Sequence, residues 1–143
     1  MDDLYRDYIL DHYRRPRNHG RLERPDISHE EDNPLCGDRI RLDLHIEDGR
    51  VADVRFDGHG CAISQASASM LTEMIKGRTL PELHLLGLQD ILDNLGIETI
   101  SPARLKCALL PLRVLRVGVF GSTSSPEEDE AGAAEGEDVW PPR

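Results

Sequence analysis

The sequence has little basic charge, no long apolar run and few cysteines, and each shortage excludes a class of protein. Its 143 residues contain 17 Lys and Arg against 27 Asp and Glu, which gives a net charge of −10. Sequence-independent binding to nucleic acid needs a basic surface, and so does charge-driven docking on an anionic membrane. We therefore expect neither nucleic acid nor a membrane among the partners of this chain.

Long apolar segments are also missing. No apolar run approaches the roughly 20 residues that a membrane-spanning helix needs. The first residues, Met1-Asp2-Asp3-Leu4, are acidic and lack the basic and then apolar profile of a secretory signal peptide. These features predict a soluble, cytoplasmic protein.

Cysteine is scarce, and its count of three is odd. Thiols stay reduced in the cytoplasm, so a disulfide framework explains them poorly. A body of about 120 residues can bury an ordinary core without a metal, so the cysteines are not needed for a minimal fold. Metal ligation or thiol chemistry explains them better.

The composition divides the chain into two parts. Residues 1–121 have the length of one domain and contain no internal repeat. Residues 122–143 are dominated by Ser, Pro, Glu, Gly and Ala and hold seven acidic residues against one basic residue. Such a segment cannot bury enough apolar surface to offset the entropy of ordering it. We expect a disordered acidic tail after residue 121.

The apolar pattern of the domain predicts a β-hairpin followed by helices. Residues 39–46 and 50–57 alternate apolar and polar side chains, and Asp48-Gly49 between them is a strong hairpin turn signal. Residues 18–33 are expected to form a loop with at most a weak edge strand near Ile27. The predicted fold class is α+β, a small antiparallel sheet with helices packed on one face.

Helices are expected where apolar residues recur at three- and four-residue steps, and where local signals mark a helix end, such as the capping box of Thr79 and Glu82 or the glycines at 77 and 96. The expected ranges are 4–14, 62–76, 80–86, 89–95 and 103–117. Pro111 lies inside the last of them, where proline removes an N–H and crowds the preceding turn. We therefore expect the last helix to kink at Pro111 or to end early.

Each cysteine lies where one predicted element gives way to the next. Cys36 precedes the first strand of the hairpin, Cys61 lies between the second strand and a helix, and Cys107 lies in the first turns of the last helix. The start of a helix stabilises a thiolate at Cys61. Arg104 and Lys106 are expected to do the same for Cys107. These positions favour reactive thiols.

Asp38 lies two residues after Cys36 and can place a carboxylate beside that sulfur. Three thiolates and one carboxylate form a reasonable tetrahedral set for zinc, and thiolate-rich sites also suit iron–sulfur clusters. Glycines at 37, 58 and 60 allow the backbone to bend and to approach closely. Because the spacing contains no Cys-x-x-Cys pair, the residues alone leave both a three-cysteine metal site and three buried, idle cysteines open.

The segments around the cysteines resemble those of a known family. In order, they are Asn33-Pro34-Leu35-Cys36-Gly37-Asp38, Gly58-His59-Gly60-Cys61-Ala62-Ile63-Ser64 and Ala103-Arg104-Leu105-Lys106-Cys107-Ala108. They resemble the three signatures of the iron–sulfur cluster assembly scaffold family, the IscU/SufU group. The strings Asp11-His12-Tyr13 and Pro16-Arg17-Asn18-His19-Gly20 resemble the N-terminus of that family, so the resemblance covers about residues 1–117.

The details resemble the SufU branch. Lys106 stands where the IscU branch has a histidine, and the string from Gly60 to Ser64 is also SufU-like. The resemblance implies a zinc site whose ligands are Cys36, Asp38, Cys61 and Cys107. It also implies that persulfide sulfur is accepted from a SufS-like cysteine desulfurase, with Cys107 as the candidate acceptor.

The wider family implies a second role for the same ligands. As a scaffold, the chain would hold iron or a nascent, transient [2Fe–2S] cluster on Cys36, Asp38, Cys61 and Cys107 and pass it to apo iron–sulfur acceptor proteins. A non-enzymatic scaffold and a zinc-dependent sulfurtransferase therefore both remain open. The alternative from another class is a zinc-stabilised interaction module without sulfur-transfer chemistry.

Overall fold

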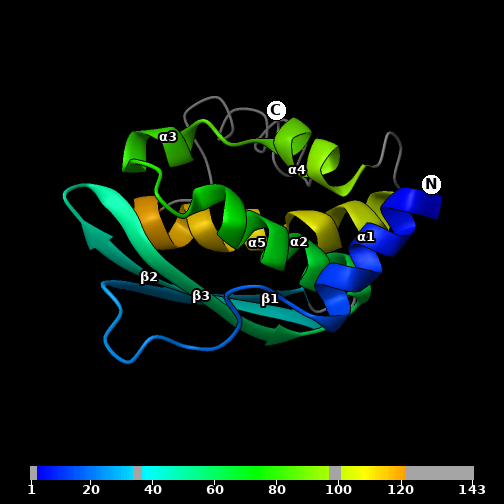
Figure 1. The fold of residues 1–143 in the computed structure, drawn as a ribbon, viewed down its shortest axis with the longest axis horizontal. Coiled ribbons are helices and arrows are strands. Elements are labelled where there is room, and N and C mark those ends of the chain that lie inside the picture. Colours follow the sequence, from blue (N-terminus) through cyan, green and yellow to red (C-terminus); the bar gives the residue numbers. More distant parts are fainter. Residues whose placement is uncertain (1–2, 34–36, 97–100, 122–143) are drawn as a thin grey trace.

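The computed structural model describes residues 3–33, 37–96 and 101–121 (Figure 1). Its elements in chain order are α1 (Asp3–Arg14), β1 (Ile27–Asn33), β2 (Asp38–Glu47), β3 (Arg50–His59), α2 (Ala62–Ile75), α3 (Leu80–His84), α4 (Leu88–Leu95) and α5 (Pro102–Phe120). Cys36 and the acidic tail lie outside the described residues. The division at residue 121 and the disorder of the tail therefore stay predictions.

The three strands form one antiparallel sheet in the order β1-β2-β3. The predicted hairpin of β2 and β3 is confirmed, and its turn residues Asp48 and Gly49 both have positive φ, at 53° and 74°. Such a turn matches the right-handed twist of the flanking strands. The hairpin therefore follows from local sequence.

The edge strand allowed near Ile27 is present as β1, but it has seven residues, Ile27–Asn33, so the expectation that residues 28–33 form a loop was wrong. Its residues are Ile-Ser-His-Glu-Glu-Asp-Asn, and most of these are poor strand formers in isolation. Ile27, His29 and Glu31 are half-buried, and the residues between them are exposed. Pairing along β2 and contact with α5 therefore override the weak local propensity.

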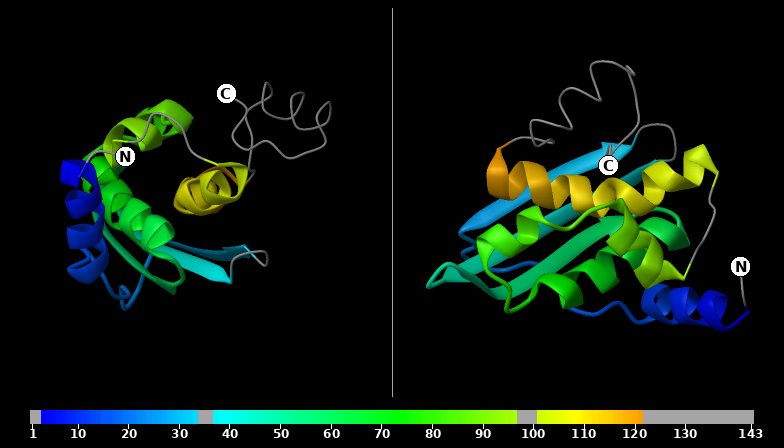
Figure 2. Two further views of the ribbon diagram at one scale, coloured as in Figure 1. Left: turned by 90° about the vertical axis from the view of Figure 1, so that its right-hand side faces the viewer. Right: turned by 90° about the horizontal axis from the view of Figure 1, so that it is seen from above.

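All the helices lie on one side of the sheet, which confirms the predicted fold class (Figures 1 and 2). Helices α2 and α5 contact the strands, while α1 and α4 pack on α2. Buried small residues such as Ala66, Ser67 and Ala68 allow α2 to lie close to its neighbours. Helices α2 and α5 thus form the layer directly on the sheet, with α1 beside α2 (Figure 2).

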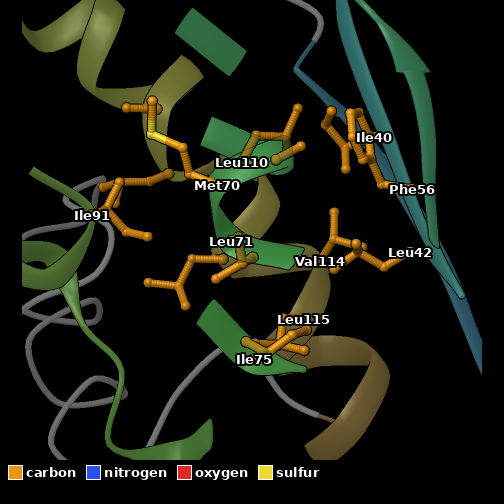
Figure 3. Packing of buried hydrophobic residues seen from close by; sticks show 14 of the residues in the cluster. Ile40, Leu42, Phe56, Met70, Leu71, Ile75, Ile91, Leu110, Val114 and Leu115 are labelled. Carbon is orange, nitrogen blue, oxygen red and sulfur yellow. The ribbon is translucent and has the colours of Figure 1, made fainter. Parts of the chain in front are cut away.

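The hydrophobic core fills the space between the sheet and the two central helices (Figure 3). It includes side chains from β2 and β3, from α2 and from α5: Ile40, Leu42, Phe56, Met70, Leu71, Ile75, Leu110, Val114 and Leu115. Burying each large apolar side chain contributes about 1.5 to 3 kcal/mol. This core fixes α2 and α5 on the sheet.

Helix α5 continues through Pro111 to Phe120, so the expected early end was wrong. Proline in a helix interior costs roughly 3 kcal/mol. Leu109, Leu110 and Leu112 are buried around Pro111, and their burial offsets that cost. The helix ends at Gly121, which has φ of 74° and caps it in the left-handed conformation. The kink at Pro111 stays a prediction.

Asp43 lies on the strand face that points away from the helices, yet it is 1% exposed. Its carboxylate accepts hydrogen bonds from the backbone N–H of Leu22 at 3.0 Å, the Ser28 hydroxyl at 2.7 Å and Arg41 Nε at 2.9 Å. A buried carboxylate or N–H group that lacked a hydrogen-bond partner would lower the stability of the fold. Asp43 thus anchors the segment between α1 and β1 over this face of β2.

His12 joins α1 to α2. It is 1% exposed, its Nδ1 lies 2.7 Å from the Ser69 hydroxyl, and its Nε2 lies 3.8 Å from a Glu73 carboxylate oxygen. Burial lowers the pKa of His12, and this outweighs the opposite effect of Glu73. The folded protein therefore favours a neutral ring at this position.

We expect His12 to make the protein less stable in mild acid. An unfolded histidine has a pKa of about 6.5. The pKa of His12 is lower in the folded protein than in the unfolded chain. The stability that neutral His12 contributes is therefore complete above the unfolded pKa, and it is lost as the pH falls from the unfolded pKa toward the folded pKa. Urea unfolding at about pH 7.5 and about pH 5.5 should show a smaller loss for His12→Asn, which cannot titrate, than for the wild type.

His45 provides the control for this prediction, because the effect has the opposite sign there. Hydrogen bonds with Glu47 and Asp26 raise the pKa of His45, so its contribution is present at low pH and is lost as the pH rises. His45→Gln should therefore make the loss of stability in acid larger, not smaller. Equal acid sensitivity in His12→Asn and wild type would contradict the assignment.

Candidate metal-binding site

The β2–β3 register creates the first half of the site at one end of the sheet. Arg39 pairs with His59, so Asp38 at the start of β2 lies beside the residues that follow β3. Cys61 comes next and is the N-cap of α2. Asp38 is fully buried, whereas Cys61 is partly exposed.

Two interactions join Asp38 to Cys61. The backbone N–H of Cys61 donates to Asp38 Oδ1 at 2.8 Å, and Cys61 Sγ lies 3.7 Å from Asp38 Oδ2. The two carboxylate oxygens therefore have different surroundings. One is held by the backbone, and the other faces a sulfur.

Helix α5 brings Cys107 to the same place. Ser101 caps the helix by accepting a hydrogen bond from the backbone N–H of Arg104, and Cys107 lies in the second turn, 2% exposed. The Ser67 hydroxyl donates to the backbone carbonyl of Ala108 at 2.7 Å, which fixes α5 against α2 beside the cysteine. Packing of the two helices thus sets the position of the Cys107 sulfur.

One carboxylate oxygen of Asp38 and the sulfurs of Cys61 and Cys107 all lie within 4.8 Å of one another. Within residues 3–33, 37–96 and 101–121, this is the single group of three or more His, Cys, Asp or Glu ligand atoms so close together. Two sulfurs and one oxygen fit zinc, and they also fit a thiolate-bound iron–sulfur unit. The arrangement can hold a metal ion.

The structure thus brings together three of the four residues that the sequence singled out, and Cys36 lies outside its described part. Their roles as ligands stay predictions. Arg104 and Lys106 are exposed, whereas Cys107 is buried. The expectation that these cations stabilise a thiolate at Cys107 also stays a prediction. Sequence reasoning missed the backbone N–H of Cys61 as a partner of Asp38, because a main-chain donor leaves no signal in the sequence.

Comparisons with known proteins agree with this geometry. Residues 4–126 match the profile of the NifU-like N-terminal domain. The chain belongs to the NifU-like N-terminal domain family. The predicted resemblance to iron–sulfur cluster assembly proteins is confirmed.

Relatives within the family carry two kinds of name. The chain is 40% identical to the zinc-dependent sulfurtransferase SufU of Bacillus subtilis over 135 residues, covering 83% of this chain and 91% of that protein. It is 34% identical to the iron–sulfur cluster assembly scaffold protein IscU of Azotobacter vinelandii over 119 residues, covering 80% and 91%. Sulfur transfer and cluster scaffolding are thus both represented among the relatives of this family member.

Solved structures of the family share the fold. One is assigned to the iron–sulfur cluster assembly scaffold of the SUF system from Fervidobacterium islandicum, with a TM-score of 0.68 and 31% identity, covering 79% of this chain and 94% of that one. A NifU-like N-terminal protein from Brucella abortus has a TM-score of 0.67 at 24% identity, covering 82% and 93%, and supports the fold alone. In the part of the chain that the structure describes, no helix is both long and apolar enough to cross a membrane.

Proposed function

We propose that this chain is a cytoplasmic sulfur acceptor in iron–sulfur cluster assembly, with a zinc site formed by Cys36, Asp38, Cys61 and Cys107. The observation that carries the proposal is the grouping of Asp38, Cys61 and Cys107 within 4.8 Å. The relation to a zinc-dependent sulfurtransferase at 40% identity supports zinc and sulfur transfer in particular. Its donor partner would be a cysteine desulfurase, and its products would serve apo iron–sulfur proteins.

The chemical step is a thiol–disulfide-type exchange. A cysteine thiolate of this chain attacks the outer sulfur of the desulfurase persulfide and forms a new S–S bond with it. The S–S bond of the donor breaks, and the donor cysteine leaves as a thiolate. No external oxidant or reductant is needed, because the transferred sulfur keeps its oxidation level.

The four ligands would hold zinc, and bound zinc would keep the sulfurs as thiolates and shield them from oxidation. Asp38 is suited to be a ligand because it is buried and its Oδ1 accepts a hydrogen bond from the Cys61 N–H. Thiolates are the ligands that favour zinc and iron–sulfur units over Mg²⁺ or Ca²⁺.

The proposal names Cys107 as the sulfur acceptor, and its burial sets a condition. Cys107 is 2% exposed, whereas Cys61 is partly exposed. A desulfurase persulfide can reach the Cys107 sulfur only if the residues that cover it move when the partner binds.

A scaffold role is the second candidate, and the IscU relatives favour it. There the same residues would carry iron and sulfide as cargo. An oxygen ligand binds a soft iron–sulfur unit less firmly than a thiolate, so Asp38 would ease release of the cargo. The two roles differ in what remains on the protein after sulfur is delivered.

The test is the metal and acid-labile sulfide content of the anaerobically purified chain, measured again after incubation with a cysteine desulfurase, cysteine and ferrous iron. We expect zinc to remain, desulfurase turnover to rise and one cysteine to gain the mass of a sulfur atom. Replacement of zinc by iron and sulfide, with maturation of an apo-ferredoxin, would establish the scaffold instead. If zinc stays tightly bound and no cysteine gains sulfur, the chain is instead a zinc-stabilised interaction module.

A further inference from the structure

We infer that Gly60 is a positioning residue for the Asp38 ligand, and that the Cys61 N–H leaves Asp38 one oxygen, Oδ2, to offer a metal. The inference rests on the proposed function in one respect, that Asp38 is a metal ligand. It adds a residue that carries no ligand atom and a statement of which carboxylate oxygen binds. Both come from the contacts at the end of β3.

Gly60 leaves the space that the Asp38 side chain occupies. A Cβ added at residue 60 would lie 2.0 Å from Asp38 Oδ1, 2.7 Å from its Cγ and 2.9 Å from its Cα. Protein interiors are close-packed, and no Cβ fits within such distances. Any larger residue would therefore drive the carboxylate out of its position or push the two strand ends apart.

The carboxylate that fills this space is fixed in orientation. The Cys61 N–H holds Oδ1 at 2.8 Å, and Oδ2 lies on the side of the Cys61 sulfur, 3.7 Å from it. Asp38 is fully buried, so water does not compete for Oδ1. The backbone thus uses one oxygen of Asp38, and the other faces the Cys61 sulfur.

Gly58 and Gly20 show how Gly60 differs from glycines that only allow strands to approach or the backbone to take a positive φ. Gly58 has φ of 159°, and a Cβ there would lie 2.0 Å from the backbone carbonyl oxygen of Arg39, so its role is to let β2 and β3 approach. Gly20 has φ of 129° with nothing within 4 Å of an added Cβ, so alanine there causes backbone strain alone. Gly60, at φ of 145°, is the one of the three whose Cβ would meet Asp38.

The experiment is a double-mutant cycle on zinc affinity with Gly60→Ala, Asp38→Ala and the double variant, using competition with a chromophoric chelator. Because Gly60 acts through a ligand, we expect Gly60→Ala to lower affinity by about 10- to 100-fold, as loss of an outer-shell partner does. In the Asp38→Ala background, the same change should cost clearly less, because only the 2.9 Å approach to the Cα of residue 38 then remains. The visible spectrum of the Co²⁺-loaded Gly60→Ala protein should shift toward that of Asp38→Ala.

The control variant is Gly20→Ala, which lies away from the site and should lower the unfolding midpoint but keep the Co²⁺ spectrum of the wild type. An equal loss of zinc affinity from Gly60→Ala with and without Asp38 would overturn the inference, because Gly60 would then act through the backbone. Wild-type affinity and spectrum in Gly60→Ala would overturn it too.

Asp38→Asn tests the oxygen assignment without disturbing Gly60. Its amide oxygen can still accept from the Cys61 N–H, which turns the amide nitrogen, a poor ligand, toward the sulfurs. We expect an unfolding midpoint near that of the apo wild type and zinc affinity as low as in Asp38→Ala. Zinc affinity equal to wild type in Asp38→Asn would overturn the single-oxygen assignment.

These measurements use zinc and Co²⁺ with the purified chain and no desulfurase. If the double-mutant cycle gives the expected zinc affinities but the chain accepts no sulfur from a desulfurase, the proposed function is wrong and the role of Gly60 is still supported. A wild-type chain that binds neither metal would overturn both.

Discussion

Cys107→Ser is expected to abolish sulfur acceptance and to lower zinc affinity by more than 100-fold. Loss of an outer-shell partner of a metal ligand costs about 10- to 100-fold, and loss of a ligand itself costs more. Serine keeps the size of the side chain but replaces a thiolate by a hydroxyl that zinc binds poorly. The measurements are zinc affinity by chelator competition and the mass of each cysteine peptide after incubation with desulfurase and cysteine.

Arg113→Ser is the matched control for this variant, because Arg113 lies on the exposed side of the same helix and pairs with Glu31. It should keep both zinc and sulfur acceptance. If Cys107→Ser retains the full zinc affinity and full sulfur acceptance of the wild type, Cys107 is neither a ligand nor the acceptor. If it loses zinc but still gains sulfur, the acceptor is another cysteine.

The second large effect is expected in the core that holds α5 in place. Leu115 is 1% exposed and lies between α5 and Ile75 of α2 (Figure 3). Leu115→Ala should lower the free energy of unfolding by about 2 to 5 kcal/mol, since it removes buried methyl groups and leaves a cavity. That is a large part of the roughly 5 to 15 kcal/mol by which domains of this kind are stable.

Leu85→Ala makes the same chemical change at a residue that is 79% exposed. Its effect should stay within about 0.5 kcal/mol. Urea unfolding of the metal-free protein compares the two without a contribution from zinc. Equal losses at Leu85 and Leu115 would contradict the description of the core between α2 and α5.

Local sequence signals predicted the elements that depend on neighbours in the chain. The β2–β3 hairpin follows from strict alternation around Asp48-Gly49. Helix α3 follows from a capping box, in which Thr79 and Glu82 each bind the other's backbone N–H. The expectation of a loop failed at β1, where pairing with β2 and contact with α5 decide.

The sequence by itself determined the family, the fold class and the four candidate ligands, because motif order and alternation are written in the chain. Only the tertiary structure decided that Asp38 and Cys61 meet Cys107, which is 46 residues beyond Cys61 in the chain. It also decided that Gly60 clears space for a carboxylate and that His12 is buried. The physical reason is that strand register and helix packing set these distances, and both arise from burial of the whole core at once.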